Sequence, residues 1–72
     1  MYGPGWYSLC FKEYVGNKYL LFTRTVLVPI GHFVTENTIV SYVWDDKLIQ
    51  EGLNNGKIEL FKISKECRKF YR

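Results

Sequence analysis

The sequence predicts an α+β fold, in which a small antiparallel sheet carries one short packed helix in the order ββ(β)αβ. Three observations lead to this class. The chain contains no alanine, and residues that favour strands (Val, Ile, Thr, Tyr, Phe and Trp) are abundant. Two β-rich runs flank Gly16-Asn17, and a capped apolar segment follows Asp45-Asp46. With 72 residues, the chain is expected to form a single domain, 1–72.

The N-terminal part predicts a flexible lead over residues 1–5 and then a β-hairpin. Glycine and proline alternate in the lead, which blocks regular structure there. Residues 6–15 and 18–28 form the two expected strands, and glycine at the first central position predicts a type II′ turn at Gly16-Asn17. This turn sets a register in which Val15 faces Lys18 and Phe11 faces Phe22.

The register separates the hairpin into two faces. The expected core face holds most of the aliphatic side chains of the hairpin together with the facing pair of phenylalanines: Leu9, Phe11, Val15, Leu20, Phe22 and Val26. The other face mixes polar residues with three rings, and we expect it to be partly exposed. Its rings are Trp6, Tyr14 and Tyr19, with Lys12 between them.

The second half of the chain starts after Pro29, which has no N–H to donate and ends the hairpin. Residues 30–37 are expected to form a loop. The β-branched and aromatic segment 38–44 predicts a third strand, on which Tyr42 and Trp44 share a face. The alternative is the start of a helix running to Leu53, because Val40, Trp44 and Leu48 follow a helical spacing.

A short helix is predicted over 47–53, with an N-cap at Asp45 or Asp46. The sequence Asn54-Asn55-Gly56 supplies a left-handed stop. Residues 57–63 then predict a final strand, so the hairpin gains one or two further strands. The last residues, 65–72, form a basic tail that the sequence leaves open as helix, strand extension or frayed end.

No catalytic or metal-binding motif is recognisable. His32 is the single histidine, and neither Cys10 nor Cys67 has the spacing of a nucleophile–base pair or of a zinc site. We therefore expect no enzyme activity, no metal and no cofactor. A Cys10–Cys67 disulfide remains open, although a chain without a signal peptide is expected to keep both thiols reduced in the cytoplasm. No apolar run reaches the ~20 residues of a membrane helix, so no membrane contact is expected.

The net charge of +3 resides in the tail, because residues 1–64 carry six basic and six acidic side chains. The aromatic hairpin is thus nearly neutral, which favours a protein partner over a nucleic acid. A small core also favours association, including a homodimer. The expected protein-binding residues are Trp6, Lys12, Tyr14, Tyr19, Tyr42 and Trp44.

The leading hypothesis is a small non-enzymatic binding protein that modulates or inhibits a protein partner. Self-association of the chain is part of this hypothesis. Size and composition resemble those of stand-alone small proteins of bacteriophages and other mobile elements, which would place it in the host cytoplasm. The alternative is a protein that binds single-stranded nucleic acid by stacking bases on strand aromatics. The tail would supply its charge and further rings through Lys65, Arg68, Lys69, Phe70, Tyr71 and Arg72.

Overall fold

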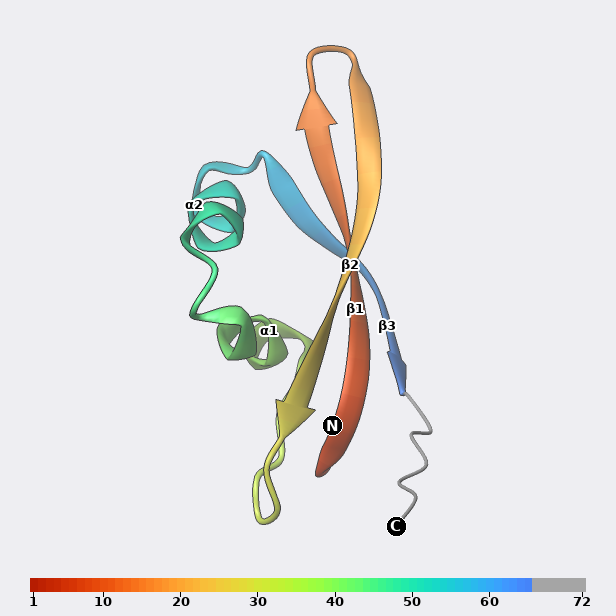
Figure 1. Ribbon diagram of the computed structural model, residues 1–72, viewed down its shortest axis with the longest axis vertical. Helices are drawn as coiled ribbons and strands as arrows, with labels where there is room; N and C mark the ends of the chain where they lie inside the picture. Colours follow the sequence, from red (N-terminus) through yellow and green to blue (C-terminus); the bar gives the residue numbers. More distant parts are fainter. Residues whose placement is uncertain (66–72) are drawn as a thin grey trace, which may run out of the picture.

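The computed structural model describes residues 1–65 and confirms the α+β class. A three-stranded antiparallel sheet in the order β2-β1-β3 lies beside a layer of short helices (Figure 1). The elements are β1 (Gly5–Val15), β2 (Lys18–Val28), α1 (Glu36–Ile39), the 3₁₀ helix η1 (Val40–Val43), α2 (Lys47–Asn55) and β3 (Ile58–Lys65).

The β1–β2 hairpin has the predicted register along its whole length, including Val15 opposite Lys18 and Phe11 opposite Phe22. A type II′ turn requires a positive φ at its first central residue only. Gly16 has a φ of 64° and Asn17 does not have a positive φ, so both central residues meet this requirement. The expected lead, residues 1–5, contacts the rest of the fold. Tyr2 pairs with Val34 as an isolated bridge, and β1 already begins at Gly5.

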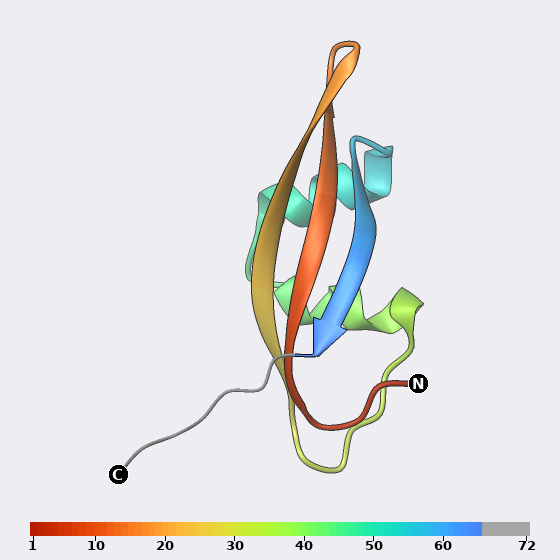
Figure 2. The ribbon, with the colours of Figure 1, turned by 90° about the vertical axis from the view of Figure 1, so that its right-hand side faces the viewer.

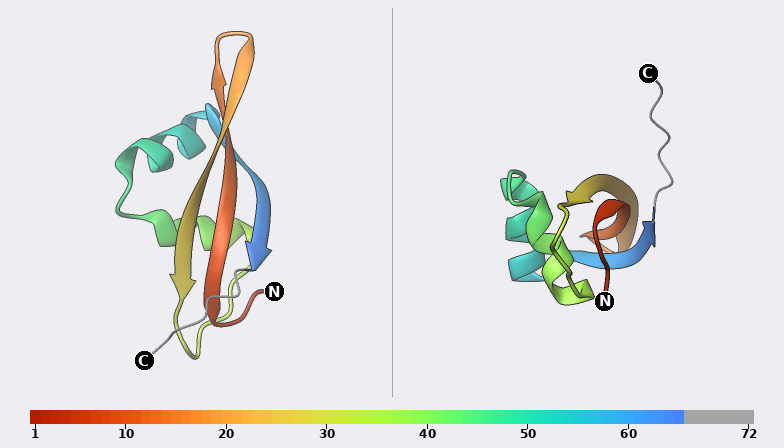
Figure 3. Two further views of the ribbon diagram at one scale, coloured as in Figure 1. Left: turned by 45° about the vertical axis from the view of Figure 1, so that its right-hand side comes forward. Right: turned by 90° about the horizontal axis from the view of Figure 1, so that it is seen from below.

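The core lies between the sheet and the helices, all of which cover one side of the sheet (Figures 2 and 3). The predicted core face of the hairpin does face the helices, and Leu9, Phe11 and Val26 on it are buried. Val15 and Leu20 are 54% and 59% exposed because the hairpin tip extends beyond the helices (Figure 1). The buried set is Tyr7, Leu9, Phe11, Val26, Val28, Val34, Ile39, Val43, Ile49 and Ile58.

The predicted strand over 38–44 is wrong, because this segment is helical in α1 and η1. Thr35 caps α1 through a reciprocal capping box with Thr38, in which the Thr35 amide donates to the Thr38 hydroxyl at 2.8 Å. Ile39 and Val43 are four residues apart, and both are buried against the sheet. A helix allows both of these side chains to be buried, and this burial outweighs the strand preference of the β-branched residues.

The alternative of one helix running to Leu53 also differs from the structure. The chain breaks between η1 and α2, where the Asp46 carboxylate accepts a hydrogen bond from the Ile49 amide at 3.2 Å and caps α2. Trp44 and Leu48, two members of the expected helical stripe, are 76% and 77% exposed. Gly56, with a φ of 84°, ends α2 as predicted and leads directly into β3.

Candidate protein-binding surface

The sheet has one side that none of the described helices covers, and we call this side the open face (Figure 2). Alternation along the strands places on it every second residue of the hairpin. Its apolar members are largely accessible, with exposed fractions of 53% for Leu21, 47% for Leu27 and 55% for Phe61. The open face comprises Trp6, Ser8, Cys10, Lys12 and Tyr14 of β1, Tyr19, Leu21, Thr23, Thr25 and Leu27 of β2, and Glu59, Phe61, Lys62 and Ser64 of β3.

An aromatic cluster formed by Lys12, Tyr14, Tyr19 and Phe61 occupies the distal half of the open face. The Tyr14 and Tyr19 rings meet edge to face, with centroids 6.3 Å apart. The Lys12 Nζ lies 4.7 Å from the Tyr19 centroid and 4.9 Å from that of Phe61, within the range of cation–π attraction. The ammonium group is therefore held between two rings at the centre of the cluster.

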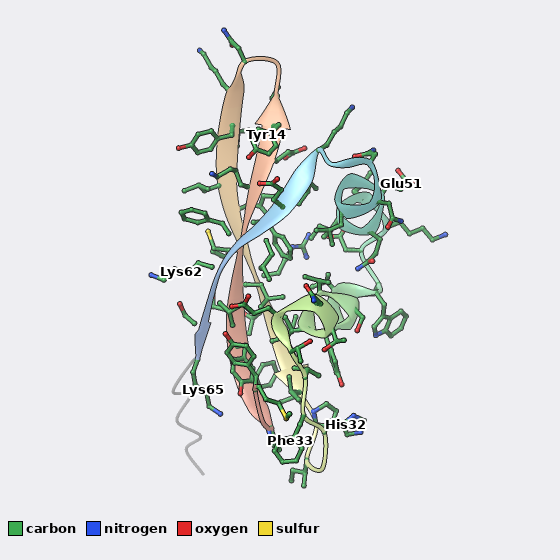
Figure 4. All side chains as sticks on the ribbon, turned by 180° about the vertical axis from the view of Figure 1, so that it is seen from behind. Tyr14, His32, Phe33, Glu51, Lys62 and Lys65 are labelled. Carbon is green, nitrogen blue, oxygen red and sulfur yellow. The ribbon has the colours of Figure 1, made fainter. Side chains whose placement is uncertain are left out.

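Tyr14 also binds the acidic residue of this region, since its hydroxyl donates to Glu59 Oε1 at 2.9 Å. This hydrogen bond to the carboxylate raises the pKa of Tyr14, and desolvation and the negative charge of Glu59 act in the same direction. The phenol therefore stays protonated and keeps the carboxylate in place. Figure 4 shows Tyr14 on the distal part of the hairpin and Lys62 pointing away from the side of the helices.

Trp6 is on the open face, as predicted, but lies far from the tyrosines with which the sequence groups it. It pairs with Leu27, whereas Tyr14 pairs with Tyr19. Eight positions separate Tyr19 from Leu27 on β2, which corresponds to about 27 Å of extended strand. The open face therefore carries two apolar groups, one near each end of the hairpin.

Tyr42 and Trp44 do not join the open face, because their segment is helical and lies on the opposite side of the sheet. The Tyr42 hydroxyl lies 3.3 Å from His32 Nδ1 in the loop after β2. Trp44 follows η1 and is 76% exposed there. These two predicted protein-binding residues are thus separated from the hairpin cluster.

The sequence prediction missed Phe61, and a β-bulge explains why. Strict alternation would put Ile63 on the same face as Phe61, but a register shift opposite Cys10/Phe11 returns Ile63 to the core side. The signal was available, since Ile63 is apolar but out of phase with Ile58 and Leu60. Such an interruption in an otherwise alternating strand is typical of a bulge.

The sequence prediction also missed a concave region between the distal hairpin and α2. It is an open cleft of about 600 Å³, and its lining includes Leu20, Phe22 and Leu48. Arg24 and Asp46 form an ion pair along it. The cleft results from the hairpin tip extending past the helices, which no local sequence pattern reveals.

Of the residues expected to bind nucleic acid, only Lys65 lies within the described part of the chain. Its Nζ donates to the Pro4 carbonyl at 3.0 Å and lies 4.9 Å from the Tyr7 centroid, so it is engaged within the fold. The other expected contacts, Arg68, Lys69, Phe70, Tyr71 and Arg72, lie outside the described residues, as does Cys67.

Side chains that could take part in catalysis or metal binding are dispersed over residues 1–65. No three His, Cys, Asp or Glu residues in this range are grouped to hold a metal ion, and no charged side chain there is buried. His32 is exposed, and Cys10 is a half-buried free thiol. Within the same range, no helix is long and apolar enough to cross a membrane.

Comparisons with known protein families, with curated proteins and with solved structures found no match to this chain. Its class therefore follows from its own geometry. It is a two-layer α+β domain with helices on one side of a three-stranded sheet and an accessible aromatic surface on the other.

Proposed function

We propose that this chain is a non-enzymatic binding protein whose open face contacts a protein partner and modulates that partner by covering part of its surface. The observation that carries the proposal is the accessibility of Tyr19, Leu21 and Phe61 on a side of the sheet that the described helices leave uncovered. Tyrosine and tryptophan are enriched among the residues that dominate protein interfaces. A sheet surface with neighbouring rings and few charges fits such a contact.

The charges of the open face indicate the chemistry of the partner. Lys12 and Lys62 are its cations, and Glu59 is its one acidic residue, which Tyr14 already binds. A partner surface that is apolar with one or two carboxylates would complement these groups. The two rings around Lys12 also shield it from water, so a carboxylate that reaches it there forms a stronger pair than one in solution.

The same charges argue against a polyanionic ligand on this surface. A nucleic acid needs a series of cations along its backbone as well as stacking rings. Glu59 lies directly beside the aromatic cluster, and the described part of the open face offers two cations, Lys12 and Lys62, rather than a series of them. The open face therefore favours a protein over single-stranded nucleic acid.

Capture from host lysate with two matched variants tests the proposal. The open-face variant replaces Tyr19, Leu21 and Phe61 by alanine, and the control variant replaces the even more exposed Trp44 and Leu48 on the helical side. The proposal expects a captured protein that the open-face variant loses and the control variant retains. Equal capture by both variants would contradict it.

The acidic character of the partner is tested on the captured protein itself. Lys12→Glu should weaken binding of the purified partner, whereas Lys47→Glu, on the helical side, should leave it nearly unchanged. A parallel titration with a single-stranded oligonucleotide at low salt tests the alternative, that the open face binds nucleic acid. Tight oligonucleotide binding that the open-face variant abolishes would overturn the proposal in favour of nucleic acid.

A further inference from the structure

The outer edge of β2 has a row of backbone groups that the fold does not use. The Tyr14 amide donates to the Lys57 carbonyl at 2.8 Å, so this residue of β1 faces β3. Backbone groups alternate in direction along a strand, so the neighbouring residues Glu13 and Val15 face β2 and bond Leu20 and Lys18. On β2, the backbone groups of every second residue, starting from Lys18, thus point toward β1. The N–H and C=O groups of the alternate residues point away from the sheet, and these residues are Tyr19, Leu21, Thr23, Thr25 and Leu27.

The β2 edge lacks the features that normally protect an edge strand. It has no bulge and no proline over Lys18–Val28, and no described segment hydrogen-bonds to its outward groups. One of its charges, Lys18, is at the turn, and the other, Arg24, is paired with Asp46. An edge of this kind readily accepts another strand.

The opposite edge, β3, is protected by comparison. It contains a bulge at Phe61, opposite Cys10 and Phe11 of β1, and it carries Glu59, Lys62 and Lys65 in a shorter strand. Bulges and charges of this kind discourage pairing with a further strand. The contrast between the two edges points to β2, rather than β3, as the edge able to accept a further strand.

We propose that a second copy of this chain pairs with β2 in antiparallel orientation, about a two-fold axis at Thr23. Thr23 is the midpoint of Lys18–Val28, so this register uses the whole strand on both copies. Thr23 then faces Thr23 of the second copy, Thr25 faces Leu21, and Leu27 faces Tyr19. Each outward N–H and C=O on one copy meets an outward group of the other, so all of them are satisfied.

The side chains permit this register as well. Arg24 comes opposite Phe22 and Lys18 opposite Val28 of the second copy, so no like charges stand directly opposite one another. On the open face, the two threonines at the axis are small and polar. Leucine meets threonine or tyrosine on either side, which are pairs that suit a sheet surface.

The dimer would also join the two separate apolar groups of the open face. The Tyr14–Tyr19 pair of one copy continues directly into the Leu27–Trp6 pair of the other, across four adjacent strands. This arrangement occurs twice, once on each side of the axis. The pairing itself follows from the β2 edge and does not depend on the proposed function of the open face.

A charge-swap experiment on the full chain tests the pairing and its register. Thr23→Lys and Thr23→Glu each place like charges opposite one another at the axis, where each should weaken the homodimer about fivefold or more. Mixing the two variants should restore dimerisation, because a lysine then faces a glutamate. Sedimentation velocity from micromolar to millimolar protein measures all four samples: wild type, both variants and the mixture.

Thr25→Pro and Thr25→Ala form a second, independent pair. Proline removes an outward N–H that the monomer does not use, whereas alanine keeps it. Two hydrogen bonds are lost in the dimer, each worth about fivefold, so Thr25→Pro should weaken association about 25-fold. Circular dichroism confirms that each variant is folded, and the charge-swap pair decides the question if the proline variant is not.

The proposal predicts a wild-type dimer, weaker association of Thr23→Lys, Thr23→Glu and Thr25→Pro, recovery in the mixture, and little effect of Thr25→Ala. A wild-type monomer at millimolar protein would overturn it. A dimer that all the Thr23 and Thr25 variants retain would also overturn it, because such a dimer uses another surface.

Discussion

Alanine at position 52 should destabilise this protein, although alanine is favoured over glycine inside a helix by about 1 kcal/mol. Gly52 is buried in α2 and packs directly against Ile58 at the start of β3. A Cβ at position 52 would lie 2.9 Å from the Ile58 Cβ, which is closer than carbon atoms approach in folded proteins. Ile58 is 6% exposed, so it has little room to move away.

The expected magnitude follows from these two opposing effects. Overpacking of this kind costs about 1–3 kcal/mol, and the gain in helix propensity offsets about 1 kcal/mol of it. The net loss of up to about 2 kcal/mol is a large part of the roughly 3–5 kcal/mol available to a chain of this size. Urea and thermal unfolding should therefore show a clearly lower midpoint for Gly52→Ala.

Two controls make this measurement decisive. Glu51→Ala alters the exposed neighbour on the same helix and should change the free energy of unfolding by less than about 0.5 kcal/mol. In a double-mutant cycle, Ile58→Ala should remove much of the extra cost of Gly52→Ala, since it deletes Cγ1 and Cδ1, the two Ile58 atoms closest to a Cβ at position 52. A Gly52→Ala variant more stable than the wild type would refute the close packing of α2 on β3.

Three further predictions concern the turn, the cap and the open face. Gly16→Ala should cost about 1 kcal/mol in thermal unfolding, because Gly16 has a φ of 64°. Asp46→Ala removes the α2 cap and should cost about 1–2 kcal/mol, while Asp45→Ala should be nearly neutral. Glu59→Gln should lower the pKa of Tyr14 toward its usual range in an absorbance titration, with Tyr14→Phe identifying the signal. Because the pKa of Tyr14 is raised in the folded state, its hydrogen bond to Glu59 stabilises the fold fully below pH ~10, and this contribution is lost as the pH rises through the pKa of folded Tyr14. A flat alkaline stability profile would contradict this assignment.

The hairpin was predictable because its determinants are local. Gly16-Asn17 specifies a two-residue turn, and the turn alone sets every cross-strand pair of β1 and β2. The exposure of Val15 and Leu20 was not predictable, because it depends on where the helices end relative to the hairpin tip. Alternation identifies the face of a strand but does not tell how much of that face is covered.

The segment 38–44 shows the opposite situation, in which local preference is misleading. Its β-branched residues favour a strand, but burial of Ile39 and Val43 against the sheet requires a helix. Thr35 was a readable signal of that helix, because threonine is a favoured N-cap residue, followed here by Glu36 in the first turn. The distance between Trp6 and the tyrosines likewise depends on position along the strand, which a shared face does not determine.

Site-specific photo-crosslinking tests the central claim, that the open face is the contact surface, most directly. A benzophenone amino acid at Phe61 samples the open face, and the same residue at Leu48 samples the helical side, with both positions well exposed. Phe61 lies on β3, away from the β2 edge, so its crosslinks are not expected to come from a second copy. The account predicts a crosslinked partner protein from position 61 and none from position 48. Crosslinking from position 48 alone, or from neither position, would contradict it.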